Sequence, residues 1–136
     1  MKELCKLEEP FRQLLLTPGS MLFSDETTEQ VRVYNQQKGK YEYHKQYIWG
    51  IKNPDRKIAY YLYDNGSRSM KVAQKFFAGF RGSVTTDGYN VYKMFEREDS
   101  SITRYGCMAH VRRKFVDALQ TDHRSADIIN LISNLY

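Results

Sequence analysis

Two aspartates each follow a short run of apolar or β-branched residues that is typical of a strand. Asp25 comes after residues 21–24, and Asp87 comes after residues 84–86. If the two strands are neighbours in a sheet, the carboxylates converge at one edge, where they can hold Mg²⁺ or Mn²⁺. Two such ions can clamp the attacking and leaving oxygens of a phosphodiester. Glu26 is a candidate neighbouring ligand, although strand alternation turns its side chain to the face opposite Asp25.

Each of these motifs also has an ordinary structural explanation, which the spacing does not exclude. Aspartate at a strand end often caps a turn, and Asp87-Gly88 is a common turn pair. Cys107, His110 and His123 include a Cys-x-x-His spacing that suits zinc, but a structural zinc site needs four ligands and Cys5 is the one other thiol. We therefore expect Cys107 to pack as a small apolar residue and His110 to hydrogen-bond within the fold, without zinc.

Two basic segments are candidates for contact with a polyanion. Residues 35–57 include Lys38 and Lys40, and the second segment holds Arg104, Arg112, Arg113 and Lys114. The chain has a net charge of +5, with −3 on residues 1–30 and +8 on the remainder. Such a surface attracts nucleic acid without regard to base sequence, and the tyrosines of residues 35–57 could stack on bases. A solvated charged face with tyrosines packed in strands is the alternative, and composition leaves both open.

The elements that must position these side chains are predicted from hydrophobic spacing and turn residues. We expect a β-hairpin from the strands 47–52 and 57–63, and an exposed loop over 35–46. The 136 residues allow one domain, and the order of elements indicates a mixed α/β sheet with helices on its faces. No apolar run is long enough to span a bilayer and the N-terminus is not a secretory leader, which favours the cytoplasm. The other predicted strands are 21–27, which continues in extended form to residue 34, then 82–88 and 100–106. The predicted helices are 4–16, 68–77, 89–95, 107–120 and 125–136.

Several fragments, taken in order, resemble the catalytic core of insertion-sequence transposases of family sixty-six. They are Ser24-Asp25-Glu26-Thr27, Tyr47-Ile48-Trp49, residues 77–82 leading into Thr86-Asp87-Gly88-Tyr89, and residues 106–115. The resemblance implies a ribonuclease H-like mixed sheet with helices on both faces and an Asp-Asp-Glu metal triad. It also implies cleavage and transfer of DNA strands with Mg²⁺ or Mn²⁺, at transposon ends and at target DNA. Asp25 and Asp87 would be the first two acids, and Cys107 and His110 would have a supportive role.

The resemblance is incomplete at the C-terminal end of the chain. The family's third acid, a glutamate, lies on a helix beyond the segment that residues 130–136 resemble, and the N-terminal DNA-binding region is missing. We therefore interpret the chain as a fragment: residues 1–19 are an N-terminal helix, residues 20–106 a partial catalytic core, and residues 107–136 a helical segment, the candidate start of an insertion.

As a fragment, the chain is expected to bind metal weakly and to be inactive alone. Because the third acid is lacking, whether the chain is itself an enzyme is left open. A non-catalytic module that binds nucleic acid or regulates transposition, through another copy or a full-length transposase, is the alternative. The resemblance places the protein in a bacterial cytoplasm, at the nucleoid when it is on DNA.

Overall fold

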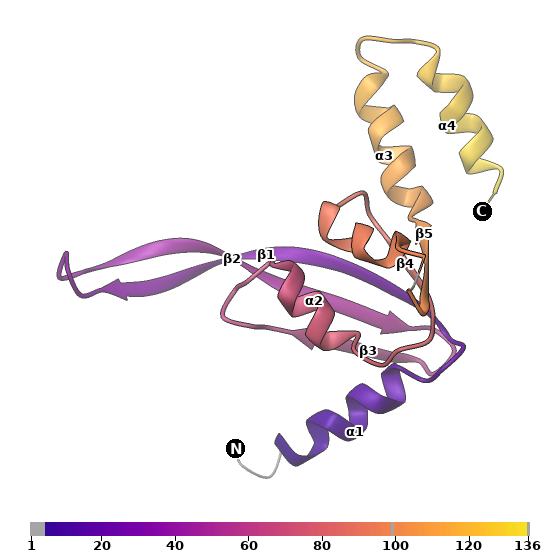
Figure 1. The fold of residues 1–136 in the computed structure, drawn as a ribbon. Helices are drawn as coiled ribbons and strands as arrows, with labels where there is room; N and C mark the ends of the chain where they lie inside the picture. Colours follow the sequence, from indigo (N-terminus) through magenta and orange to yellow (C-terminus); the bar gives the residue numbers. More distant parts are fainter. Residues whose placement is uncertain (1–4, 99, 136) are drawn as a thin grey trace.

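A computed structural model describes residues 5–98 and 100–135, which form a single sheet accompanied by helices (Figure 1). The sheet has five strands in the order β3-β2-β1-β4-β5. The first three strands form an antiparallel meander, and β4 and β5 are added in parallel beside β1. The expected mixed α/β sheet is confirmed. Its elements are α1 (Cys5–Leu15), β1 (Met21–Asn35), β2 (Lys40–Asn53), β3 (Ile58–Leu62), α2 (Met70–Phe76), β4 (Gly82–Thr86), the 3₁₀ helix η1 (Asn90–Glu96), β5 (Ile102–Gly106), α3 (Met108–Ala118) and α4 (Ser125–Ser133).

The core fills one face of the sheet. Strand alternation turns Leu22, Trp49 and Val84 to this face, where they are at most 1% exposed. Helices α2 and η1 cover the face with a cluster of aromatic side chains, in which Phe77 meets Phe95 edge-on with ring centroids 5.3 Å apart. The opposite face carries exposed apolar side chains. In the part of the chain that the structure describes, α2 and η1 thus cover one of the two faces. The exposed side chains of the uncovered face include Met21, Phe23, Tyr61 and Tyr105.

The predicted hairpin is present as β2 and β3, and β1 and β2 form a second, longer hairpin that the sequence does not predict. The two strands pair continuously from Phe23↔Lys52 to Asn35↔Lys40, so the exposed loop expected over 35–46 is wrong. β4 pairs with β1 over three residues, and β3 pairs with β2 over five. Residues 28–47 therefore leave the sheet as a two-stranded ribbon, which we call the arm (Figure 1). The residues were mistaken for a loop because neither side of the arm is buried, and the polar sequence shows no inward-facing apolar alternation.

The remaining elements agree with the sequence patterns to within a few residues. The predicted strands become β3, β4 and β5, and Asp87 directly follows β4. α1 continues through Pro10, in its middle. The predicted helix ends at residues 4 and 136 lie outside the described residues. Within residues 5–98 and 100–135, the helices are too short or too polar to cross a membrane.

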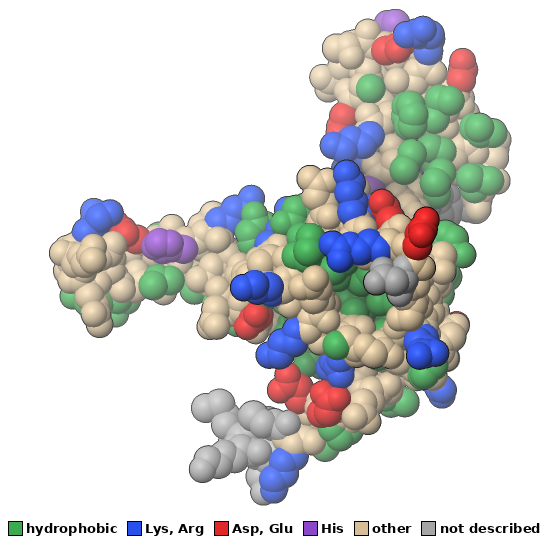
Figure 2. All heavy atoms as spheres, in the orientation of Figure 1, with side chains coloured by type: hydrophobic (Ala, Val, Ile, Leu, Met, Phe, Trp, Pro, Cys, Tyr) green, Lys and Arg blue, Asp and Glu red, His purple; other side chains and the backbone are tan. Residues whose placement is uncertain are grey.

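The two C-terminal helices form a hairpin that projects from the end of the sheet (Figure 1). Helix α3 packs mainly against α4. Hydrophobic side chains gather on the hairpin surface, whereas Lys and Arg side chains stand at the far end of the arm (Figure 2). Leu131 and Leu135 are both more than 60% exposed. The hairpin is thus less packed than the sheet that carries it.

Candidate metal centre

Asp25 and Asp87 converge where the parallel pairing of two neighbouring strands ends: Asp87 directly follows β4, and Asp25 lies within β1, which continues to Asn35. β1 and β4 pair with Phe23 beside Thr85, so each aspartate lies two residues beyond the last matched pair. One ligand atom from each aspartate and one from His110 lie within 4.8 Å of one another. The residue opposite Asp25 on β2 is Gly50, which has no side chain to cover the carboxylate. The predicted convergence of the two carboxylates is therefore present in the structure.

His110 reaches this edge because α3 begins directly beside it. The backbone N–H of Cys107 donates to the carbonyl oxygen of Thr86 at 2.8 Å, which fixes the start of α3 against the end of β4. One helical turn later, His110 Nε2 lies 3.5 Å from Asp25 Oδ2. Its other ring nitrogen, Nδ1, is buried and has no hydrogen-bond partner within the described part of the chain. The sequence pointed to His110 as a supportive residue, but its spacing gave no sign that it would join the carboxylates.

Two grooves flank the three side chains. One, of about 270 Å³, is lined by Asp87, Cys107, His110 and Lys114 among others. The second, of about 350 Å³, adds Asp25 and Arg113. Cys107 lines both grooves, and among the described residues the group of clustered ligand atoms does not include it. Cationic side chains thus border the carboxylates on the α3 side.

Glu26 lies on the opposite face from Asp25, as strand alternation predicts. Its side chain is 0% exposed and accepts hydrogen bonds from Arg68 Nε at 2.9 Å and Nη2 at 2.7 Å. The hydroxyl of Tyr92 also donates to Glu26, and Ser24 Oγ lies 2.9 Å from that hydroxyl. Burial raises the pKa of Glu26, although the hydrogen bonds from Tyr92 and Arg68 lower it in part. The structure therefore separates Glu26 from the metal candidates and places it in a buried network behind them.

Arg104 has hydrogen-bond partners that the sequence does not predict. Its guanidinium donates to Thr86 Oγ1 at 2.9 Å and to the carbonyl oxygen of Asp87 at 2.7 Å, and it pairs with Glu96. The side chain is 13% exposed. Arg104 was expected to contact DNA; in the structure it is half-buried, holds the end of β4 that carries Asp87, and lines the groove of about 270 Å³, so its contact with DNA stays a prediction.

The other predicted DNA-binding residues are exposed and belong to two separate regions. Arg112, Arg113 and Lys114 lie on α3, next to the acidic edge. Lys38 and Lys40 lie at the end of the arm, where Lys38 Nζ is 3.0 Å from Glu42 Oε1. The structure brings the first group, and not the second, close to the carboxylates.

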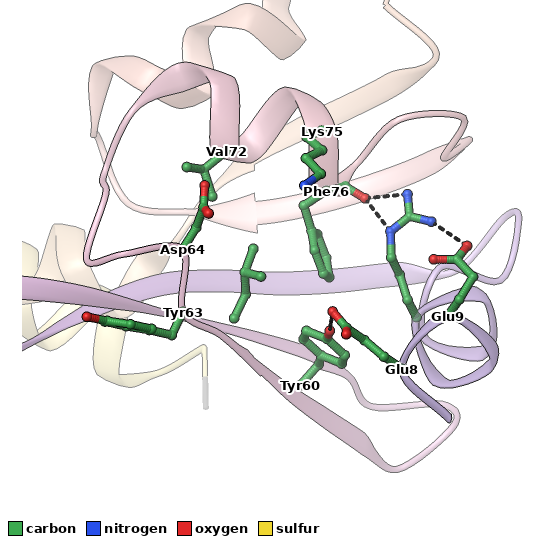
Figure 3. Close-up of a pocket in the computed structure, with 10 residues that line it drawn as sticks. Glu8, Glu9, Tyr60, Tyr63, Asp64, Val72, Lys75 and Phe76 are labelled. Atoms are coloured by element: carbon green, nitrogen blue, oxygen red, sulfur yellow. Dashed lines mark hydrogen bonds and ion pairs between the residues drawn. The ribbon is translucent and has the colours of Figure 1, made fainter. Parts of the chain in front are cut away.

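A groove larger than these two lies elsewhere, between α1, β3 and α2 (Figure 3). It has a volume of about 430 Å³ and carries both Glu8 and Lys75. Arg12 crosses it to donate to the carbonyl oxygen of Phe76 at 2.8 Å, and Tyr60 donates to Glu8. These polar groups already bind one another, so size alone does not mark this groove as the site.

The three clustered groups fit a divalent cation. Carboxylate oxygens suit Mg²⁺ and Mn²⁺, whereas an imidazole nitrogen favours a transition metal, so the set as a whole suits Mn²⁺ better than Mg²⁺. Their ligand atoms lie within 4.8 Å of one another, slightly more than the distance of about 4 Å that two bonds of about 2 Å can span, so a small rotation of the side chains would bring them to one ion. A mixed sheet of order 3-2-1-4-5 with an acidic pair at the carboxyl edge defines a ribonuclease H-like α/β protein.

Comparison with known proteins gives the family. The model of the family described as "Transposase IS66 family" matches residues 1–136, and the chain belongs to this family of transposases with an Asp-Asp-Glu domain. Two uncharacterized proteins of Sinorhizobium fredii (strain NBRC 101917 / NGR234) are similar to it. y4jD is 35% identical over a stretch that covers 52% of this chain and 15% of y4jD. y4qI is 29% identical over a stretch that covers 73% of this chain and 20% of y4qI. The chain thus spans a fifth or less of these relatives, and no solved structure matches it.

Proposed function

We propose that this chain supplies the metal-binding part of a catalytic domain that cleaves and joins DNA strands. The observation that carries the proposal is the convergence of Asp25, Asp87 and His110 at one sheet edge in a member of a transposase family. DNA, as transposon ends and target, is the proposed substrate, and a bacterial cytoplasm is the proposed location.

Each residue at the edge has a proposed task. Asp25 and Asp87 hold the cation, and His110 fixes the Asp25 carboxylate or provides a nitrogen ligand. When bound, the cation would polarise the phosphodiester and stabilise charge on the attacking and leaving oxygens. Arg113 and Lys114, which line the adjoining grooves, hold the DNA backbone by its phosphates. Arg104 positions the strand end beneath Asp87.

We further propose that the chain alone does not cleave DNA. The resemblance implies a third carboxylate, and the acidic group of the described residues contains two. With two carboxylates, the clamp for two metal ions is incomplete, so metal binding is weak and the chemistry requires the third acid.

Mn²⁺ binding tests the metal site directly. We expect the chain to bind Mn²⁺, measured by electron paramagnetic resonance, and Asp25→Asn or Asp87→Asn to weaken binding at least about tenfold, because each removes an anionic ligand. Asp117→Asn, on the exposed surface of α3, is the matched control and should bind as the unchanged chain does. Equal Mn²⁺ affinity in all four proteins would reject the site.

A plasmid assay tests the expected inactivity. Purified chain incubated with supercoiled plasmid and Mn²⁺ should leave the plasmid intact, as judged by agarose electrophoresis. Metal-dependent nicking that disappears in Asp87→Ala would show that two carboxylates suffice and would contradict the proposal.

The second candidate is a nucleic-acid-binding or regulatory module that pairs with a full-length transposase. It is favoured by the exposed cations of the arm, which line neither of the two grooves beside the acids. DNA binding by a chain in which Asp25→Asn and Asp87→Asn leave Mn²⁺ affinity unchanged would support this function over the catalytic one.

A further inference from the structure

The arm has two faces of different chemistry. The pairing of β1 and β2 has no interruption between Phe23 and Asn35, so residues directly opposite each other share a face along its whole length. One face continues the core-facing side of the sheet, on which Ser24 pairs with Ile51. We call this the tyrosine face. In the arm it consists of the pairs Thr28↔Tyr47, Gln30↔Lys45, Arg32↔Tyr43 and Tyr34↔Tyr41.

Charge is segregated between these two faces. Both acids of the arm, Glu29 and Glu42, belong to the other face. Among residues 28–47, all of which the structure describes, the tyrosine face therefore carries Arg32 and Lys45 and no carboxylate. A solvated ribbon has no need for this segregation, whereas a surface that binds a polyanion does.

Aromatic rings and cations are interleaved along the tyrosine face. Tyr34 and Tyr41 meet edge-on with centroids 5.0 Å apart, and the Arg32 guanidinium lies 4.0 Å from the Tyr41 ring centre. Nearer the sheet, Lys45 Nζ lies 5.7 Å from the ring centre of Tyr47. The rings are nevertheless open to solvent: Tyr34 is 50% exposed, Tyr41 55% and Tyr43 72%.

The spacing of these rings suits nucleic-acid bases. Tyr41 and Tyr43 are two residues apart on one strand, which separates them by about 6.8 Å. That distance is about twice the 3.4 Å rise between stacked bases. Because the Arg32 guanidinium already covers one face of the Tyr41 ring, the open platform for a base is the 72% exposed ring of Tyr43. Bases held within a duplex cannot reach such a position, because their faces are covered by their neighbours.

We propose that the tyrosine face of the arm binds single-stranded DNA, with unpaired bases stacked on Tyr43 and its neighbours and phosphates bound by Arg32 and Lys45. This interaction needs neither metal nor the carboxylates Asp25 and Asp87. It goes beyond the proposed catalytic function, since it gives the chain a site for unpaired strands at a distance from the acidic edge.

Binding of a fluorescent oligothymidylate to the full chain, in EDTA, tests the proposal by fluorescence anisotropy. We expect Tyr43→Ala to weaken binding at least about fivefold, because one base–aromatic stack is worth about 1 kcal/mol or more. Tyr43→Phe keeps the ring and should bind as the unchanged chain does. Arg32→Gln or Lys45→Gln should lower the slope of log affinity against log salt by about 0.7, the value for one lost phosphate contact on a single strand.

Val33→Ala is the matched control, because Val33 lies on the opposite face of the same arm. It should leave binding unchanged, and circular dichroism should show all variants folded. Equal binding by the unchanged chain and Tyr43→Ala, or a duplex bound more tightly than the single strand, would overturn the proposal. Self-association through the arm without DNA binding, seen by sedimentation, would also overturn it. Asp25→Asn should bind the oligonucleotide normally, so failure of the metal site is distinguished from failure of this surface.

Discussion

Asp25 and Glu26 are adjacent carboxylates with opposite surroundings. The side chain of Asp25 is 57% exposed, beside Asp87 and His110, whereas that of Glu26 is 0% exposed and bound by Arg68 and Tyr92. The difference arises from the alternation of a strand, which sends neighbouring side chains to opposite faces of the sheet. One carboxylate is left free for a ligand, and the next anchors the strand that presents it.

The largest expected effect is a difference in the free energy of unfolding between variants at these two residues. Glu26→Ala should lower the free energy of unfolding by about 2–4 kcal/mol, because it leaves the Arg68 guanidinium and the Tyr92 hydroxyl without their acceptor. Asp25→Ala should change it by less than about 0.5 kcal/mol, as expected for an exposed side chain. Urea unfolding measures both, and equal losses would remove the distinction between an anchoring and a ligand-binding carboxylate.

A smaller effect is expected at Tyr92. Tyr92→Phe keeps the buried ring but removes the hydroxyl that bridges Ser24 and Glu26, which should cost about 1–3 kcal/mol. Tyr61→Phe, at a tyrosine that is 74% exposed, should be neutral. A neutral Tyr92→Phe in thermal unfolding would mean that Glu26 is held by Arg68 alone.

The smallest expected effect is a pH dependence. Since the pKa of Glu26 is raised in the folded protein, its protonated form is favoured by folding. This contribution to stability is present below about pH 4 and is lost as pH rises through the raised pKa. The free energy of unfolding of the unchanged chain, minus that of Glu26→Gln, should therefore fall as pH rises from about 4 toward 7. A difference that is flat or rises with pH would contradict the assigned direction.

Local patterns predicted much of the sheet and two of the three clustered groups. Short apolar or β-branched runs followed by an aspartate pointed to Asp25 and Asp87, although Asp25 lies within β1 and not at its end. The alternation rule already sent Glu26 to the other face. The arm was missed because its two sides are both solvated, so its pairing depends on the partner strand and leaves no periodic apolar signal. The hydrogen bonds of Arg104 to the end of β4 were not predicted, because a cation in a basic stretch is the same in sequence whether it faces solvent or supports a strand end.

Outside the arm, the amino-acid sequence by itself determined which segments become strands and helices, which residue types end them, and where the basic charge lies. Only the tertiary structure decided that β4 pairs beside β1 in a register that matches Asp25 with Asp87, and that α3 begins where His110 can approach both. The physical reason is that strand order and register depend on contacts between segments some 60 residues apart in the sequence, and hydrophobic periodicity within one segment carries no information about them.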